Sequence, residues 1–295
     1  MRSISREVIR SGVAMHRGYA VCAIVSGLFV APAVAQTLPA PSLTFPQIAS
    51  GDEFTWGLST GFDYATGKLG AKCGVQNFSI ICTPSATTIF DVPVTGMVQV
   101  DRLRLELTVP WVDIQGPGRF AGVFGVPVII APTNNQPTHR SGIGDITVGA
   151  AFALIREDTF LPRVEIEGVS KLPTAADGLG TGKTDYGAQV NLFKTFLPGL
   201  TTFGSLGYEW IGEINTVALH SGARATAGAE YRFLSVTAGG VFDYRQDSWQ
   251  GAPNYFAFDP YARLAIFPGI SLGIYATLGM TRSTPSSGFG FRVSI

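Results

Sequence analysis

A glycine-rich stretch is the first candidate for chemistry. GLGTGKT (178–184) contains the Gly-Lys-Thr end of a phosphate-binding loop, but that motif also needs a glycine where Asp177 stands. The next residues, 185–196, alternate in polarity like a strand, so no helix N-terminus would be available to bind phosphate. We therefore interpret 178–184 as a flexible loop and expect no bound nucleotide.

A histidine beside a serine is the second candidate. Beyond residue 35 the chain has two histidines, His139 and His220, and Ser221 follows the second. Adjacent side chains of an extended backbone point to opposite sides, so His220 and Ser221 would not meet as base and nucleophile. A hydrolase is kept as a minor alternative. We predict no catalytic residue, cofactor or metal site.

Charged residues at alternate positions form the third candidate. Glu165 and Glu167 would lie about 7 Å apart on a strand, a spacing that also suits paired-carboxylate catalysis. Acidic and basic residues are mixed at these positions, which favours ion pairs that line a polar interior and set its selectivity. The residues are Arg102, Arg104, Glu106, Arg163, Glu165, Glu167, Lys171, Glu209, Arg224, Glu230, Arg232, Asp243, Arg245, Asp259, Arg263 and Arg292.

The overall composition is apolar and poor in charge. Hydrophobic residues make up 46% of the chain and charged residues 14%, against about 25% charged in soluble proteins. Equal numbers of acidic and basic residues, 21 of each, exclude a basic nucleic-acid-binding protein. No stretch after residue 36 has the ~18 consecutive apolar residues of a spanning helix. A transmembrane β-barrel fits best, and a secreted β-sandwich is the soluble alternative.

The N-terminus has the layout of a secretory signal peptide. Arginines are frequent in the first 17 residues, an apolar run follows at 19–30, and Ala33 and Ala35 precede a cleavage point before Gln36. We predict a signal peptide at 1–35, a periplasmic segment at 36–52 and a transmembrane barrel at 53–295. Export to an oxidising compartment also predicts a disulfide between Cys73 and Cys82.

Alternation of apolar and polar residues predicts the strands of this barrel. Leu103, Leu105 and Leu107 share one face of a strand, whereas Arg102, Arg104 and Glu106 share the other. Similar segments recur to the C-terminus, with less regular ones near 87–100 and 254–267, and twelve strands can be counted. The predicted fold is all-β, an up-and-down antiparallel transmembrane barrel of about twelve strands, with apolar residues facing lipid.

The connections between these segments alternate in length. Short turns are expected near 100–101, 156–161, 197–199, 234 and 268–269; longer loops are expected at 66–86, 114–142, 174–184, 213–221, 247–253 and 282–286. Short periplasmic turns and long extracellular loops are typical of outer-membrane barrels.

Aromatic residues fall at both ends of the predicted strands, as the girdles at the two membrane interfaces of a barrel do. Those at the loop end are Trp111, Tyr186, Trp210 and Tyr244, and those at the turn end are Phe196, Tyr231 and Phe233. The 114–142 segment is long and apolar for a loop, so we expect it to occlude the mouth.

Three stretches resemble a known bacterial family. VPVTGMVQVDRLRLELTVPWV (92–112), SGIGDITVGAAFAL (141–154) and GLGTGKTDYGAQVNLFKTF (178–196) are similar to the outer-membrane proteins of the MetA-pathway of phenol degradation family. The resemblance implies a monomeric β-barrel that passes small apolar or aromatic molecules. The C-terminal strand is also similar to the signal for the outer-membrane insertion machinery, with Ile295 where Phe is usual.

These observations predict an outer-membrane channel or transporter for small molecules, including hydrophobic and aromatic ones. Its expected partners are outer-membrane lipid, the barrel-insertion machinery during biogenesis and a small-molecule solute, with no nucleic acid. A structural or adhesive barrel with a closed lumen is the alternative, and single-channel conductance would separate the two.

Overall fold

The computed structural model describes residues 54–76, 79–116, 118–121, 126–129, 139–176, 178–213, 219–246, 254–282 and 284–295. Side chains are described except at 68–76, 79–85, 118–121 and 126–129. The described residues contain no helix long and apolar enough to cross a membrane. The strands are β1 (Thr55–Gln76), β2 (Ser79–Val100), β3 (Leu103–Gln115), β4 (Gly118–Ala121), β5 (Val126–Ile129), β6 (His139–Ile143), β7 (Thr147–Ile155), β8 (Arg163–Lys171), β9 (Asp185–Leu197), β10 (Leu200–Trp210), β11 (Gly222–Phe233), β12 (Val236–Arg245), β13 (Tyr255–Phe267), β14 (Ile270–Gly279) and β15 (Ser287–Ser294).

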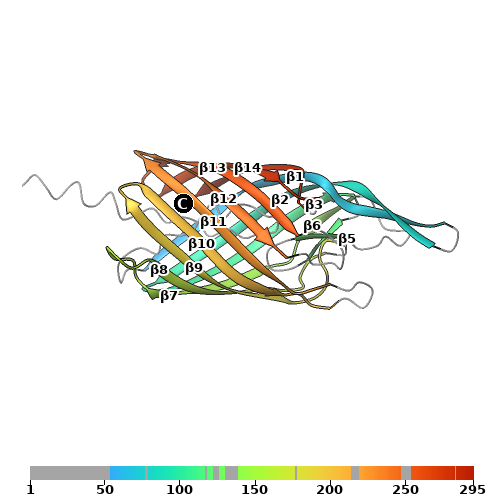
Figure 1. The fold of residues 1–295 in the computed structure, drawn as a ribbon, viewed down its shortest axis with the longest axis horizontal. Coiled ribbons are helices and arrows are strands. Elements are labelled where there is room, and N and C mark those ends of the chain that lie inside the picture. Colours follow the sequence, from blue (N-terminus) through green and yellow to red (C-terminus); the bar gives the residue numbers. More distant parts are fainter. Residues whose placement is uncertain are drawn as a thin grey trace, which may run out of the picture.

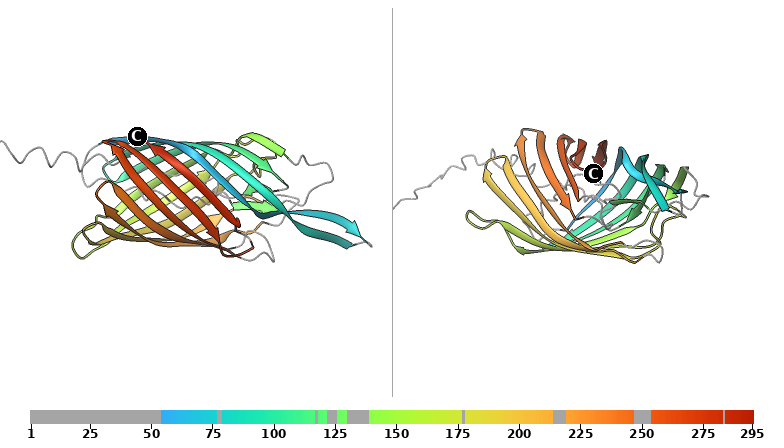
Figure 2. Two further views of the ribbon diagram at one scale, coloured as in Figure 1. Left: turned by 90° about the horizontal axis from the view of Figure 1, so that it is seen from above. Right: turned by 45° about the vertical axis from the view of Figure 1, so that its right-hand side comes forward.

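One antiparallel sheet closes on itself (Figures 1 and 2). Pairing follows the order of the chain from β1 to β3 and from β7 to β15, β3 pairs with both β6 and β7, and β15 returns to pair with β1. Among the described strands, β4 and β5 form a separate two-stranded sheet, and β6 and β7 follow one another along β3, so twelve strand positions surround the barrel. The predicted twelve-stranded up-and-down barrel is confirmed.

The turns confirm the predicted difference between the two ends of the barrel. At one end, the turn end, two residues join β2 to β3, β9 to β10, β11 to β12 and β13 to β14. Asp101 and Leu234 have φ of 51° and 53° in these turns, and Gly199 and Gly269 have φ of 90° and 80°. The connection from β7 to β8, also at this end, has seven residues. At the other end, the loop end, 13, 11, 9 and 7 residues join β8 to β9, β10 to β11, β12 to β13 and β14 to β15. The C-terminus lies at the turn end, away from the projecting β1–β2 hairpin (Figure 1).

Two predicted loops are in part strands. β1 and β2 stay paired as far as Gln76 and Ser79, so the expected loop at 66–86 is a hairpin that projects past the barrel (Figure 2). The expected loop at 114–142 contains the β4–β5 hairpin and strand β6. Backbone pairing continues in both segments where the apolar-polar alternation that marks lipid-facing strands has ended.

The two faces of the wall have the predicted polarity. Leu103, Leu105 and Leu107 are exposed on the outer face, whereas Arg104 and Thr108 are buried on the inner face. The girdle residues Trp111, Tyr186, Trp210, Phe196, Tyr231 and Phe233 are exposed, and Tyr244 is half-buried. Alternation therefore gives each strand one lipid-facing side and one side that faces the interior.

Candidate functional site: the barrel interior

The interior collects most of the charged residues singled out from the sequence. Ten of them are buried on inner faces: Arg104, Arg163, Glu165, Lys171, Glu209, Arg224, Asp243, Arg245, Asp259 and Arg292. Glu106, Glu167, Glu230 and Arg263 are half-buried on the same faces. Arg102 is half-buried in the β2–β3 turn, and Arg232 is exposed near the end of β11, so these two lie at the turn-end rim.

Arg104 of β3 is the centre of the first ion-pair cluster. Its guanidinium lies 2.5 Å from Glu106 Oε1, 3.4 Å from Glu165 Oε2 and 3.9 Å from Glu167 Oε2. Arg163 lies 3.0 Å from the other oxygen of Glu165. Glu165 and Glu167 therefore belong to one network of ion pairs with Arg104 and Arg163.

Amide side chains extend this cluster around the wall. Gln189 and Asn191 of β9 donate hydrogen bonds of 2.9 and 2.8 Å to Glu167. Arg163 also lies over the ring of Phe193, with 4.1 Å from the guanidinium carbon to the ring centre, so the cluster borders an apolar surface.

A second cluster lies across β11, β12 and β13. Asp243 accepts a hydrogen bond of 2.7 Å from Arg245 and lies 3.9 Å from Arg224. Arg245 lies 4.9 Å above the ring of Tyr255, and buried Asp259 is on the same face of β13. Arg224 of β11 is the register partner of Arg245 of β12, and Asp243 forms ion pairs with both cations.

A third cluster closes the ring between the first and last strands. Asp63 of β1 is hydrogen-bonded to Arg292 of β15 and to the Tyr275 hydroxyl of β14. Asp91 of β2 is buried and lies opposite Asp63 in the strand register. Asp63 and Asp91 were not among the predicted site residues, although Asp63 stands at one of the alternate positions of its strand that carry polar residues.

Aromatic side chains also face inward. Phe193, Phe203, Val241, Tyr261 and Tyr275 are buried and form one cluster across β9 to β14. Aromatic residues were expected on the lipid side, so these inward-facing rings were not predicted. Glycines at inner positions of neighbouring strands could have indicated them, because a residue without a side chain leaves space for a ring. A Cβ at Gly228 would lie 2.5 Å from the Phe203 ring, and one at Gly290 would lie 2.5 Å from the Tyr275 ring.

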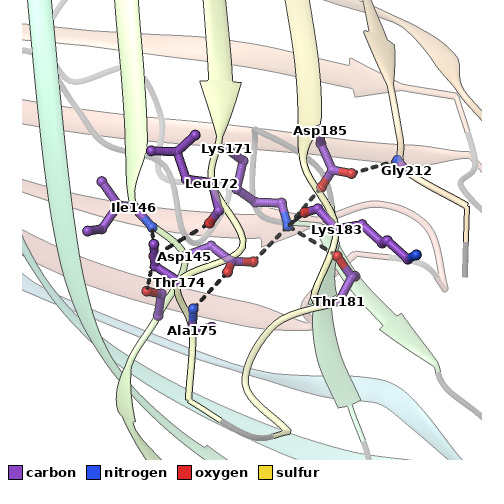
Figure 3. A network of polar contacts seen from close by, with 11 residues as sticks. Asp145, Ile146, Lys171, Leu172, Thr174, Ala175, Thr181, Lys183, Asp185 and Gly212 are labelled. Atoms are coloured by element: carbon purple, nitrogen blue, oxygen red, sulfur yellow. Dashed lines mark hydrogen bonds and ion pairs between the residues drawn. The ribbon is translucent and has the colours of Figure 1, made fainter.

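Lys171 fastens the loop between β8 and β9 to the loop end of the wall (Figure 3). Its ammonium nitrogen lies 2.7 Å from Asp145 and 2.9 Å from Asp185. It also donates to the Thr181 hydroxyl and to the Lys183 carbonyl, both at 3.2 Å. One buried lysine thus connects three wall segments with the loop.

The start of the same loop is held by backbone groups. Ala175 N–H donates to Asp145 at 3.0 Å, and Ala176 N–H donates to the Ile143 carbonyl at 3.0 Å. Leu179 follows, and it is 1% exposed against Ala65, Ile89, Val112 and Ile114 on the inner wall. The segment 178–184 is a loop, as expected, and Leu179 in it packs against the inner wall.

The other candidates for chemistry are not assembled into sites. The Lys183 side chain is exposed, and His139 pairs with Asp113 at 2.6 Å on the barrel rim. The Ser221 hydroxyl accepts a hydrogen bond from Ile211 N–H at 3.1 Å. In the described part of the chain, no three His, Cys, Asp or Glu side chains are arranged to hold a metal.

Two predicted features lie outside the described side chains. Cys73 and Cys82 are direct partners in the register of β1 and β2, but their disulfide remains a prediction. Intact mass under non-reducing conditions, lighter by two hydrogen atoms than the reduced chain, would confirm it. The second feature is the occlusion of the barrel mouth by 114–142, which also remains a prediction. Within this segment, the backbones of β4 and β5 contact β1.

A closed antiparallel barrel with an apolar outer face and a charged interior defines an outer-membrane β-barrel protein. This chain belongs to the MetA-pathway of phenol degradation family, whose model matches residues 96–295. No curated protein matches it in sequence.

One solved structure shows the same fold at low sequence identity, and two others align with lower TM-scores. The COG4313 outer membrane channel from Pseudomonas putida F1 aligns over 85% of this chain and 98% of its own, with a TM-score of 0.59 and 12% identity. A FadL homologue from Pseudomonas aeruginosa aligns over 91% and 98%, with a TM-score of 0.42 and 10% identity. The deltaS2S3 mutant of the monoaromatic hydrocarbon channel TodX aligns over 92% and 96%, with a TM-score of 0.43 and 10% identity.

Proposed function

We propose that this protein is an outer-membrane channel for small hydrophobic molecules. The observation that carries the proposal is an interior that combines paired charges with an apolar aromatic cluster inside a closed barrel. Paired charges keep an interior hydrated, while aromatic side chains offer apolar solutes a surface to contact. The structurally similar protein from Pseudomonas putida is an outer membrane channel, which supports the same role here.

The proposed route to the membrane is export with removal of residues 1–35. N-terminal sequencing of the protein from the outer-membrane fraction should then begin at Gln36. A protein found in the soluble periplasm would contradict both the location and the channel.

Liposome swelling tests the proposed transport. Phenols, aromatic acids and sugars are supplied to liposomes that contain the purified protein, with protein-free liposomes as the control. We expect phenols to enter faster than sugars of similar size. Absence of both swelling and discrete conductance would favour the structural or adhesive alternative.

The ion-pair clusters are proposed to set selectivity among these solutes. Arg224 and Arg245 flank Asp243 on the inner wall, so replacing either cation with a neutral side chain lowers the local positive charge. Arg224→Gln should lower the permeability to aromatic acids relative to phenols. An unchanged ratio would remove the selectivity role of this cluster and leave the channel itself intact.

A further inference from the structure

The inner wall at the loop end carries an apolar seat. It consists of Ala65 of β1, Ile89 of β2, and Val112 and Ile114 of β3, each at most 4% exposed. Ala65, Ile89 and Ile114 are successive neighbours across three strands. Leu179 from the β8–β9 loop covers this seat, so the chain supplies its own occupant.

The seat stands out against the rest of the interior. Asp63 and Asp91 lie two positions away along β1 and β2, and polar residues fill most other inner positions of these strands. An apolar patch facing an otherwise polar lumen attracts apolar groups because their burial removes surface from water. The isobutyl group of Leu179 meets this requirement and shows the size and chemistry that the seat accepts.

The loop that carries Leu179 is fastened on both sides of it. Ala175 is held to Asp145 on one side, and Thr181 is held to Lys171 on the other. Motion of the tip therefore does not require the loop to detach from the wall.

Glycines lie on both sides of Leu179, the last of them just after the attachment at Thr181. Gly178 and Gly182 have φ of 82° and 69°, in the left-handed region where glycine has little steric cost. Gly180 lies between them, where a Cβ would meet Asp145 Oδ2 at 2.5 Å. This arrangement lets backbone rotation at the glycines swing Leu179 away from the seat.

We infer that the seat is a binding site for small uncharged apolar solutes and that Leu179 closes it when no solute is bound. A solute that takes the seat displaces Leu179, which moves the loop tip and admits the solute to the lumen. A ligand shifts such an equilibrium by its preference for the open form. This inference rests on the proposed channel function, since it names the first site of the transported solute.

Thiol labelling measures the displacement directly. The variant L179C, in a background with Cys73→Ser and Cys82→Ser, is placed in liposomes and treated with a water-soluble maleimide, with toluene as the probe. The buried thiol should react slowly alone and about tenfold faster at saturating toluene. The exposed position Lys183 provides the matched control, because K183C should react quickly with or without toluene.

A substitution in the seat separates solute binding from general loosening. Adding Ile114→Asn to L179C should abolish the toluene response, and Val112→Ala provides a second seat variant if the first does not fold. A toluene response that survives both changes, or no response in L179C, overturns the inference.

Labelling needs no transport, so the two proposals fail separately. Solute flux without a toluene response removes the seat and keeps the channel. A toluene response without flux removes the channel and keeps the seat as a binding site.

Discussion

Arg104 illustrates why the type of cation matters in the interior. Its planar guanidinium lies within 4 Å of three carboxylates, Glu106, Glu165 and Glu167. A lysine ammonium offers the same charge from a single point and lacks the fork of donors that addresses several carboxylates at once. The arginine therefore determines how this part of the wall is neutralised.

Replacing Arg104 by lysine should destabilise the barrel. Loss of charge-assisted hydrogen bonds predicts a decrease of about 2–3 kcal/mol in the free energy of unfolding, measured in urea. Arg102→Lys is the matched control, because Arg102 lies in the turn and should change little. Equal effects of the two substitutions would show that the carboxylates do not depend on the guanidinium.

Asp158 gives a pH dependence at the turn end. Its carboxylate accepts hydrogen bonds of 2.7 Å from the backbone N–H groups of Leu161 and Phe160, which hold the pKa of Asp158 below 3.8. A depressed pKa stabilises the fold above the unfolded-state pKa, and this contribution is lost as pH falls through the folded-state value.

Comparison with Asp158→Asn isolates this contribution. The stability difference between the native protein and the variant should shrink as pH falls from about 6 to about 2, because the native carboxylate becomes protonated. Urea unfolding at each pH measures the difference. A difference that stays constant over this range would show that the turn does not depend on the ionised form.

At the level of elements, inner glycines and aromatic side chains are fitted to one another. Gly228 of β11 lies opposite Phe203 of β10, and the Phe203 ring occupies the space above it. Gly228→Ala should cost about 1–3 kcal/mol, since the added methyl group meets both the ring and a backbone oxygen at 2.5–2.6 Å. Urea unfolding measures the loss.

Gly96 of β2 supplies the control for this substitution. A Cβ at Gly96 has nothing within 4 Å, so Gly96→Ala should leave stability nearly unchanged. If Gly228→Ala were equally harmless, the packing of Phe203 over Gly228 would not contribute to the free energy of unfolding.

The same elements show what sequence could and could not predict. Strand faces were predictable because lipid on one side and a polar interior on the other impose alternation, as Leu105 and Arg104 show. Tyr275 was not predictable in this way, because its place inside depends on the space left by Gly290 on the next strand. Leu179 was missed because a loop carries no alternation, and its burial depends on a seat formed by distant strands.

At the scale of the whole molecule, closure depends on the seam between β1 and β15. Arg292 and Asp63 pair across it in buried positions, and Tyr275 adds a hydroxyl donor to Asp63. Arg292→Gln should cost about 3–5 kcal/mol because it leaves Asp63 buried without its cation. The temperature at which the compact form is lost on unboiled SDS gels should fall.

A partly exposed pair provides the comparison. Arg263 lies 3.7 Å from Glu230, away from the seam, so Arg263→Gln should cost about 0–1 kcal/mol. If both variants lost the compact form at the same temperature, the seam pair would have no special role in closure.

The seam also has a consequence for the order of events during synthesis. Leu58 and Ile295 exchange two backbone hydrogen bonds of 3.0 and 2.9 Å, although nearly the whole chain separates them. Until β15 has been made, the growing sheet has two unpaired edges, which invite pairing with other chains. A chain truncated before β15 would therefore be prone to aggregation and would not form a slightly smaller pore.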